Sequence, residues 1–314
     1  MNLQTKIPLE KQSNNLIDYN SNMLLLGSCF VENIGEKLDY FKIQNTQNPF
    51  GVLFHPKAIE TLIEKAIKRE RYSEDDLFFY NEQWHCFDAH SKLSHASKDN
   101  LLNGLNFILE ATDKQIQKSS HIVITLGTSW VYRNSENNNI VANCHKVPQK
   151  QFKKELLSVD ELSESLKNIL SLIRSVNYNA SVIFTVSPIR HLKDGFVENT
   201  QSKAHLVTAI HRVVNNRSFY FPSYEIMMDE LRDYRFYSED MIHPNQTAIN
   251  YIWEKVKDVW VSTDTLQTME DVDAIQKGLQ HKAFNPQSEA HQKFLLNIKE
   301  KQIQLQKRHQ HIMF

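Results

Sequence analysis

The chain has 314 residues, enough to bury one large hydrophobic core, alone or with a smaller annex. Hydrophobic residues make up 41%, charged residues 23%, and the net charge is −1, so bulk charge favours neither nucleic acid nor an anionic membrane as a partner. Three widely spaced cysteines do not indicate a disulfide framework. No apolar run approaches the roughly 18 residues of a membrane span, and the polar N-terminus has no secretory signal, so we expect a cytoplasmic protein.

Short apolar segments alternate with longer amphipathic ones along the chain. The former predict buried strands over residues 23–27, 121–127, 181–187 and 218–222. The latter predict helices over residues 56–71, 99–118, 158–176 and 246–260. Most of the strand segments are almost continuously apolar, as in a parallel sheet covered by helices on both faces. The pattern indicates a three-layer, doubly wound α/β fold with a mainly parallel sheet.

Two segments fit this scheme poorly. Residues 72–97 are rich in aromatic residues and histidine, and we expect them to form an insertion over the sheet. The end of the chain carries only a thin helical stripe of apolar side chains, which predicts a peripheral helical tail or an association arm outside the core. We therefore predict a main domain over residues 1–262 and a helical C-terminal extension over residues 263–314.

The first predicted strand ends in Gly27-Ser28, at a tight turn into a helix. In an open α/β sheet, sites form beyond the carboxyl ends of the strands, so the Ser28 hydroxyl is a candidate nucleophile. It needs a base within hydrogen-bond reach to be reactive. A serine after a strand is also typical of a helix N-cap, so Ser28 by itself does not decide between the two roles.

A motif far along the chain supplies such a base. Asp240 precedes His243 by three residues, in a loop before the last strongly apolar helix. At this spacing the carboxylate can bond one imidazole nitrogen and leave the other free to face a serine. The alternative is a capping aspartate beside an ordinary loop histidine, and it stays open on this short motif alone.

Several separated motifs resemble those of the GSCFA domain family, a bacterial branch similar to the SGNH (GDSL-like) hydrolases. The resemblance extends over about residues 20 to 260, through the segments GSCFV, NPFG, TLGTSW, CHK, SPIRH and FYFPSYEIMMDELRDYRFYSEDMIHP. It implies an SGNH-hydrolase fold of the flavodoxin-like type. It also implies that Ser28 is the nucleophile of a catalytic triad completed by Asp240 and His243.

The resemblance further implies which groups bind the oxyanion of the reaction. Gly51 matches the family glycine whose backbone N–H joins the oxyanion hole. SGNH hydrolases continue their third block as Gly-x-Asn-Asp, but here Gly127 is followed by Thr128 and Ser129, so the donor asparagine is absent. Losing one such donor costs on the order of 10²–10³ in rate. A substitute is therefore needed, from Asn48, Thr128 or Ser129.

Other residues are candidates for binding the substrate. His90 and His145 lie in segments that resemble family motifs. Arg190 and His191 directly follow the third predicted strand, which places them at the same edge of the sheet. Arg190 suits a substrate carboxylate or phosphate, and a surface ion pair explains it equally well.

Two other chemistries fit the sequence less well. Cys29 is next to Ser28, but a cysteine among apolar neighbours is typical of a small buried hydrophobe rather than of a reactive thiol. A histidine-rich group has no spacing of a closed zinc site, and its members are His85, Cys86, His90 and His95. We expect neither a metal nor a cofactor.

The sequence as a whole favours a serine-dependent ester hydrolase or acyltransferase of SGNH type, acting on an O-acylated carbohydrate or another small ester. The alternative is a catalytically degenerate domain that binds a glycan or a protein partner through the same cleft. The absent asparagine favours the alternative, whereas the intact Ser28, Asp240 and His243 favour the enzyme. The acyl group, the acceptor and the oligomeric state stay open.

Overall fold

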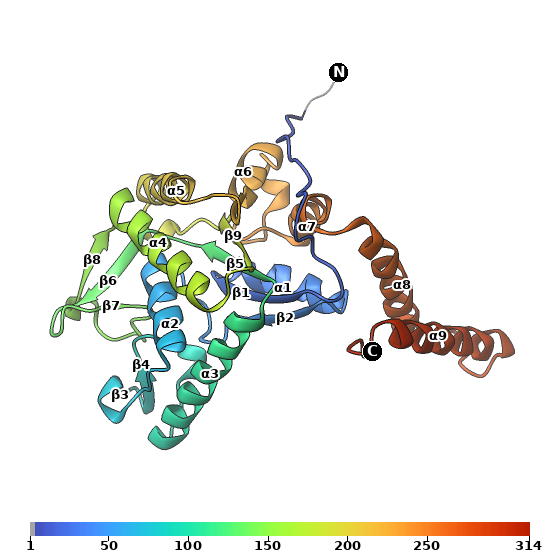
Figure 1. Cartoon of the computed structure of the whole chain (residues 1–314), viewed down its shortest axis with the longest axis horizontal. Coiled ribbons are helices and arrows are strands. Elements are labelled where there is room, and N and C mark those ends of the chain that lie inside the picture. Colours follow the sequence, from blue (N-terminus) through green and yellow to red (C-terminus); the bar gives the residue numbers. More distant parts are fainter. Residues whose placement is uncertain (1–3) are drawn as a thin grey trace.

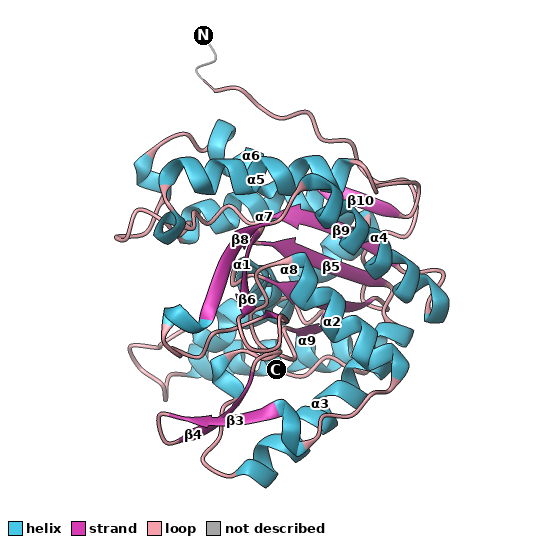
Figure 2. Cartoon of the chain, turned by 90° about the vertical axis from the view of Figure 1, so that its left-hand side faces the viewer, coloured by secondary structure: helices cyan, strands magenta, loops and turns pink. Residues whose placement is uncertain are grey.

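In the computed structural model, which describes residues 4–314, a five-stranded parallel sheet forms the centre of the molecule (Figure 1, Figure 2). The strands follow the order β10-β9-β5-β1-β2, and neighbouring strands run parallel. Their bounds are β1 Asn22–Gly27, β2 Gln44–Gln47, β5 His121–Leu126, β9 Ser181–Val186 and β10 Ser218–Phe221. The predicted doubly wound α/β fold is confirmed.

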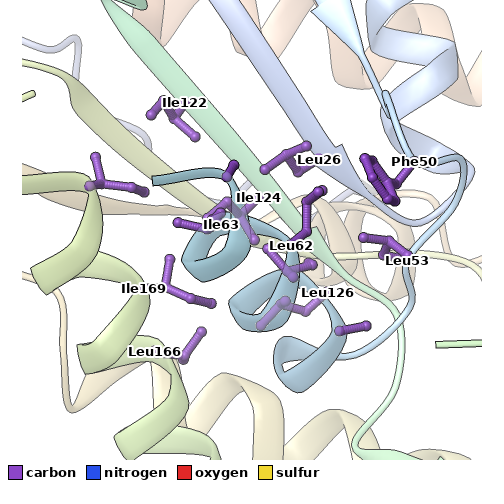
Figure 3. Packing of buried hydrophobic residues seen from close by; sticks show 14 of the residues in the cluster. Leu26, Phe50, Leu53, Leu62, Ile63, Ile122, Ile124, Leu126, Leu166 and Ile169 are labelled. Carbon is purple, nitrogen blue, oxygen red and sulfur yellow. The ribbon is translucent and has the colours of Figure 1, made fainter. Parts of the chain in front are cut away.

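Helices cover both faces of this sheet. They are α1 Phe30–Tyr40, α2 Pro56–Lys68, α3 Lys98–Lys118, α4 Val159–Val176, α5 Phe196–His211 and α7 Gln246–Trp260, with the single turn α6 Ser223–Glu225 after β10. Leu24 and Leu26 of β1 pack with α2, α3, α4 and α5, in the core of which Figure 3 shows a part. Met23 and Leu25 point the other way and pack with α1 and α7. Burial on both faces explains why the strand sequences are almost continuously apolar.

The predicted elements match the observed ones closely, with one informative difference. The four predicted strands agree with β1, β5, β9 and β10 to within one residue at each end. The helix predicted over residues 56–71 ends earlier, at Lys68. Arg69 adopts a left-handed conformation with φ 55°, and its N–H closes the helix on Ala66 O at 3.1 Å.

Two small sheets lie beside the central one, on the side of the molecule opposite to the C-terminal extension (Figure 1). β3 (Leu77–Tyr80) and β4 (Gln83–Cys86) form an antiparallel hairpin within the segment predicted to be an insertion. β6 (Trp130–Asn134), β7 (Ile140–Val141) and β8 (Phe152–Leu156) form a second sheet, which begins four residues after the end of β5. This second sheet therefore starts close to the point where β5 ends.

The C-terminal extension consists of α8 (Thr263–Gln280) and α9 (Glu289–Arg308), which project from the main body (Figure 1). Its apolar stripe is only partly outside the core. Phe294, Leu295 and Ile303 are exposed, as expected of a peripheral tail. Ile298 and Leu305 are instead buried within the hydrophobic cluster of the α1 and α7 face. The two helices approach closely at Gly278, where a Cβ would overlap the Ile298 side chain. Within residues 4–314, every helix is too short or too polar to cross a membrane.

Candidate active site

β1 and β5 lie side by side where the connections of the sheet change direction. From β1 the chain passes through α1 to β2 on one side, and it later forms β5 on the other side. In doubly wound sheets, ligands bind beyond the carboxyl ends of the strands at such a point. Ser28 follows β1 and Gly127 follows β5. Both therefore lie at the edge of the sheet where the parallel strands end, here called the carboxyl edge.

The turn that carries Ser28 requires a glycine before it. Gly27 has a φ of 130°, and a Cβ on this residue would overlap Thr125 O. Ser28 is completely buried, and its Oγ has no hydrogen-bond partner among residues 4–314. The N-cap of α1 is Cys29, one residue later. Ser28 is therefore not a helix cap.

Asp240 and His243 are bonded to each other in the loop before α7. Asp240 Oδ2 accepts a hydrogen bond from His243 Nδ1 at 2.5 Å. The other oxygen, Oδ1, accepts from the backbone N–H groups of His243 at 3.0 Å and Ile242 at 2.9 Å. The backbone hydrogen bonds and then the imidazole lower the pKa of the Asp240 carboxyl to about 2, so it is ionised at neutral pH. Asp240 thus both caps the backbone of the loop and contacts the imidazole, as the predicted Asp240–His243 pair requires.

Ser28 and His243 are not hydrogen bonded in this conformation. Ser28 is buried, whereas the side chain of His243 is 48% exposed. Arg190, which follows β9, contacts the loop that contains His243. Its Nη2 donates to Met241 O at 2.9 Å. Its guanidinium also lies over the ring of Tyr237, 5.1 Å from the centroid. The loop is thus held at the carboxyl edge, with Ser28 beneath the surface.

Several backbone N–H groups at the carboxyl edge already have acceptors. The Gly51 N–H donates to Asn48 O at 2.7 Å, so the donor implied by the family resemblance is used within its own turn here. The Gly127 N–H donates to Phe54 O at 2.7 Å, and the Gly27 N–H donates to Asn48 Oδ1 at 2.8 Å. Asn48 Nδ2 is buried without a partner in the described part of the chain.

The other two candidates for the absent donor are bound to α5. The Ser129 N–H donates to Ser202 Oγ at 2.8 Å, and Ser129 Oγ donates to Ser202 O at 3.1 Å. Thr128 Oγ1 accepts from the Trp130 N–H at 3.0 Å and lies 3.1 Å from Ser202 Oγ. Of the three candidates, Asn48 is therefore the residue whose donor is left for a ligand.

His90 and His145 both have partners in the protein. His145 is 4% exposed, its Nε2 donates to Cys86 O at 2.8 Å, and burial lowers its pKa to about 4. His90 lies against Gly51, and its Nδ1 accepts from the Lys92 N–H at 3.2 Å. His145 thus stabilises the chain after β4, whereas His90 borders the turn that contains Asn48.

Cys29 and the histidine-rich group are the residues of the two less favoured chemistries. Burial raises the pKa of the Cys29 thiol, which disfavours the thiolate that a nucleophile requires. His85 bonds Ser94 Oγ at 2.6 Å and Tyr80 O at 2.9 Å. In the described part of the chain, no three His, Cys, Asp or Glu side chains are grouped to hold a metal ion.

Buried polar atoms without partners are concentrated at the carboxyl edge. Residues 4–314 contain seven such side-chain atoms, of which four are Ser28 Oγ, Asn48 Nδ2, Arg190 Nε and His191 Nε2. Buried polar groups are nearly always hydrogen bonded, because an unpaired one loses its bonds to water. The four atoms mark the place where a ligand could complete the hydrogen bonding.

Lys203 of α5 is a residue of this region that the sequence analysis missed. It is 1% exposed, and its Nζ donates to Gly127 O at 2.7 Å and to Ser187 O at 2.8 Å, which ties the ends of β5 and β9 together. Burial lowers its pKa to about 7. A sequence signal existed, because Leu206 and Ile210 follow at i+3 and i+7 and place Lys203 on the buried face of the helix.

A pocket of about 350 Å³ lies beside the end of β5. Phe54 and Thr128 form its border with the carboxyl edge, and Trp130 of β6 forms part of its wall. The rest of the lining comes mainly from the small sheet and its loops: His55, Tyr132, Val141, Ala142, Asn143, Cys144, Lys146, Val147, Gln149 and Phe152. Aromatic and amide side chains thus meet in one cavity next to the candidate site.

The strand order and the serine after β1 define a doubly wound α/β protein with a candidate site at the switch point of its sheet. The sequence profile of the GSCFA family matches residues 22–256, and that of the GSCFA domain protein C-terminal domain matches residues 272–314. The chain belongs to the GSCFA family.

Three solved structures are similar to this chain at low sequence identity. A mutant acetyl esterase with an acetate ion is 10% identical, with a TM-score of 0.36 over 80% of this chain and 99% of that chain. A carbohydrate esterase family 3 from Talaromyces cellulolyticus is 9% identical, with a TM-score of 0.35 over 80% and 99%. An acetyl xylan esterase from the rumen bacterium Butyrivibrio proteoclasticus is 8% identical, with a TM-score of 0.37 over 83% and 64%. No curated protein sequence matches the chain.

Proposed function

We propose that this protein is a serine-dependent ester hydrolase or acyltransferase of SGNH type, in which Ser28 is the nucleophile and His243 is the base. The observation that carries the proposal is the group of four buried, unpartnered polar atoms at the carboxyl edge, which includes Ser28 Oγ. An unsatisfied buried donor or acceptor costs about 1–3 kcal/mol, and binding of a substrate explains why the fold retains several. The bonded Asp240–His243 pair nearby adds an oriented base.

In the proposed reaction, Ser28 Oγ forms a bond to the ester carbonyl carbon while His243 Nε2 takes the hydroxyl proton. The carbonyl π electrons move to the oxygen, and Asn48 Nδ2 donates a hydrogen bond to this oxyanion. When the intermediate collapses, the bond to the alcohol oxygen breaks, and His243 returns the proton to that oxygen. Water or an acceptor hydroxyl then attacks the acyl carbon while His243 takes its proton. The bond from Ser28 Oγ to the acyl carbon breaks, and His243 returns the proton to Ser28 Oγ. Ionised Asp240 stabilises the imidazolium at both stages.

This reaction requires a conformation in which His243 Nε2 and Ser28 Oγ lie within about 2.6–3.2 Å. Catalytic hydrogen bonds are often incomplete before the substrate binds. The loop over residues 238–245 is the segment that must bring His243 to Ser28. The Ser238 N–H donates to His243 O at 2.8 Å within this loop, and Arg190 Nη2 donates to Met241 O at 2.9 Å, so these are the contacts that a movement of His243 would keep or break.

The pocket beside β5 supports an acylated carbohydrate as the substrate. The pocket lies close to the nucleophile along the chain. Phe54 lines the pocket, and the residue before it, Leu53, donates its N–H to the O of Gly27, which precedes Ser28, at 3.0 Å. Trp130 offers an aromatic surface and Asn143 an amide, a combination of apolar and orienting polar groups that is typical of small-ligand sites. The sugar would lie in the pocket, with its ester directed at Ser28.

Turnover of two esters tests both parts of this proposal. With 4-nitrophenyl acetate and glucose pentaacetate as substrates, we expect Ser28→Ala to lower kcat on both by at least about 10³-fold, because the acyl-enzyme cannot form. We expect Trp130→Ala to raise KM several-fold for the sugar ester alone, since only the sugar reaches the pocket. Release of nitrophenol and of acetate gives the rates.

The outcomes separate the nucleophile from the pocket. A folded wild type that hydrolyses neither ester would contradict the enzyme and favour the non-catalytic binding domain. Full activity of Ser28→Ala would contradict the assigned nucleophile. An equal rise of KM on both esters in Trp130→Ala would contradict the sugar subsite and leave Ser28 in place.

A further inference from the structure

The imidazole of His191 lies over Gly127 at the carboxyl edge. A Cβ built on Gly127 would lie 3.1 Å from His191 Nε2, so the ring would have to shift by a few tenths of an ångström to admit a larger residue. The ring also packs edge-on against Phe54, with centroids 5.3 Å apart and an interplanar angle of 82°. The backbone N–H of His191 donates to Asn199 Oδ1 at 2.8 Å. Packing and this backbone bond hold the residue, while Nε2 is buried without a partner among residues 4–314.

His191 is a neutral imidazole at neutral pH. Burial, the nearby Lys203 and then His243 lower its pKa to about 3. Lys203 belongs to α5, and His243 belongs to the loop before α7. A neutral imidazole has a hydrogen on only one of its two nitrogens. When that hydrogen is on Nε2, this atom is an uncharged hydrogen-bond donor. Such a donor can polarise a carbonyl and stabilise a developing oxyanion.

We propose that His191 Nε2–H is the second oxyanion donor of the site, acting with Asn48 Nδ2 in place of the asparagine that the segment after Gly127 lacks. This inference rests on the proposed function of Ser28. It explains three observations together: the ring occupies the space above Gly127, its polar atom faces no protein acceptor, and Thr128 and Ser129 are bound to α5 instead. The donor thus comes from the end of β9 rather than from the end of β5.

Lys203 is the positioning residue for this donor. Its bonds to Gly127 O at 2.7 Å and Ser187 O at 2.8 Å tie together the ends of β5 and β9, and the His191 ring lies over the first of these ends, at Gly127. In its protonated form, Lys203 also disfavours protonation of His191. The lysine therefore supports a donor that stays neutral and stays in place, without contact to the substrate.

A matched pair of variants tests the role of His191. His191→Met and His191→Gln have similar length and volume, but only glutamine places an N–H near the position of Nε2. We measure the rate at which a fluorophosphonate labels Ser28, since the attack on phosphorus also develops a negative oxygen. We expect His191→Met to react about 10²-fold slower than wild type, as for loss of one oxyanion donor. We expect His191→Gln to label at least tenfold faster than His191→Met. Thermal unfolding of each variant checks that it folds.

The possible failures are distinguishable. If wild type is labelled at Ser28 and His191→Met reacts within threefold of its rate, His191 is not a donor and the nucleophile stands. If both variants lose the same factor, the role is structural and the inference is likewise overturned. If folded wild type is not labelled at Ser28, the proposed function itself fails, and the inference fails with it.

Discussion

Replacing His243 by alanine should lower kcat for ester hydrolysis by about 10³–10⁴-fold or more, because Ser28 loses the base that takes its proton. The same change should leave the free energy of unfolding within about 0.5 kcal/mol of wild type, because the side chain is 48% exposed in a surface loop. Steady-state kinetics and urea unfolding measure the two effects. A large loss of activity without a loss of stability is the signature of a catalytic rather than a structural histidine.

Two neighbouring substitutions sharpen this expectation. Asp240→Asn keeps an acceptor for the two backbone N–H groups but cannot hold the imidazole in the required tautomer, so a loss of about 10⁴-fold is expected. Glu239→Gln changes an exposed acid in the same loop and should retain full activity. Activity in His243→Ala comparable to wild type, or an equal loss in Glu239→Gln, would exclude His243 as the base.

The largest expected effect on stability is that of Gly27→Ala, at the turn before Ser28. We expect at least about 3 kcal/mol of destabilisation. The new Cβ would overlap Thr125 O, and the alanine would have to adopt a φ of 130°, which L residues rarely do. The obstacle is backbone of the neighbouring strand, which cannot move without breaking the β1–β5 pairing. Denaturant unfolding of the purified variant measures the loss.

Gly104→Ala is the matched control for this substitution. Gly104 lies inside α3, and a Cβ there would meet no atom within 4 Å. In a helix interior alanine is favoured over glycine, so we expect stabilisation by about 0.5–1 kcal/mol. If Gly27→Ala were as stable as Gly104→Ala, the tight turn assigned to Gly27 would be wrong.

The parts of the fold that the sequence predicted are those whose burial leaves a local pattern. β1, β5, β9 and β10 were found because both of their faces are covered, whereas β2 was missed because its four side chains are polar and only half buried. Two of these side chains bond one carboxylate, because Asp39 accepts from Asn45 Nδ2 at 2.7 Å and from Gln47 Nε2 at 2.9 Å. An edge strand satisfied in this way has no apolar periodicity to detect.

The same distinction applies to the site. The Asp240–His243 bond could be predicted because three residues of loop bring the two side chains together. Other features of the site depend on contacts between segments more than sixty residues apart. Thr128 and Ser129 are bound to α5, and the His191 ring lies over Gly127. Such contacts leave no spacing in the chain from which they could be deduced.

The central claim is that Ser28 is the nucleophile, and mass spectrometry of the full chain after treatment with a fluorophosphonate tests it most directly. We expect folded wild-type protein to gain one phosphonyl group, found on the peptide that contains Ser28, and Ser28→Ala to gain none. A folded wild type that stays unmodified, or that carries the group on another residue, would contradict the assignment.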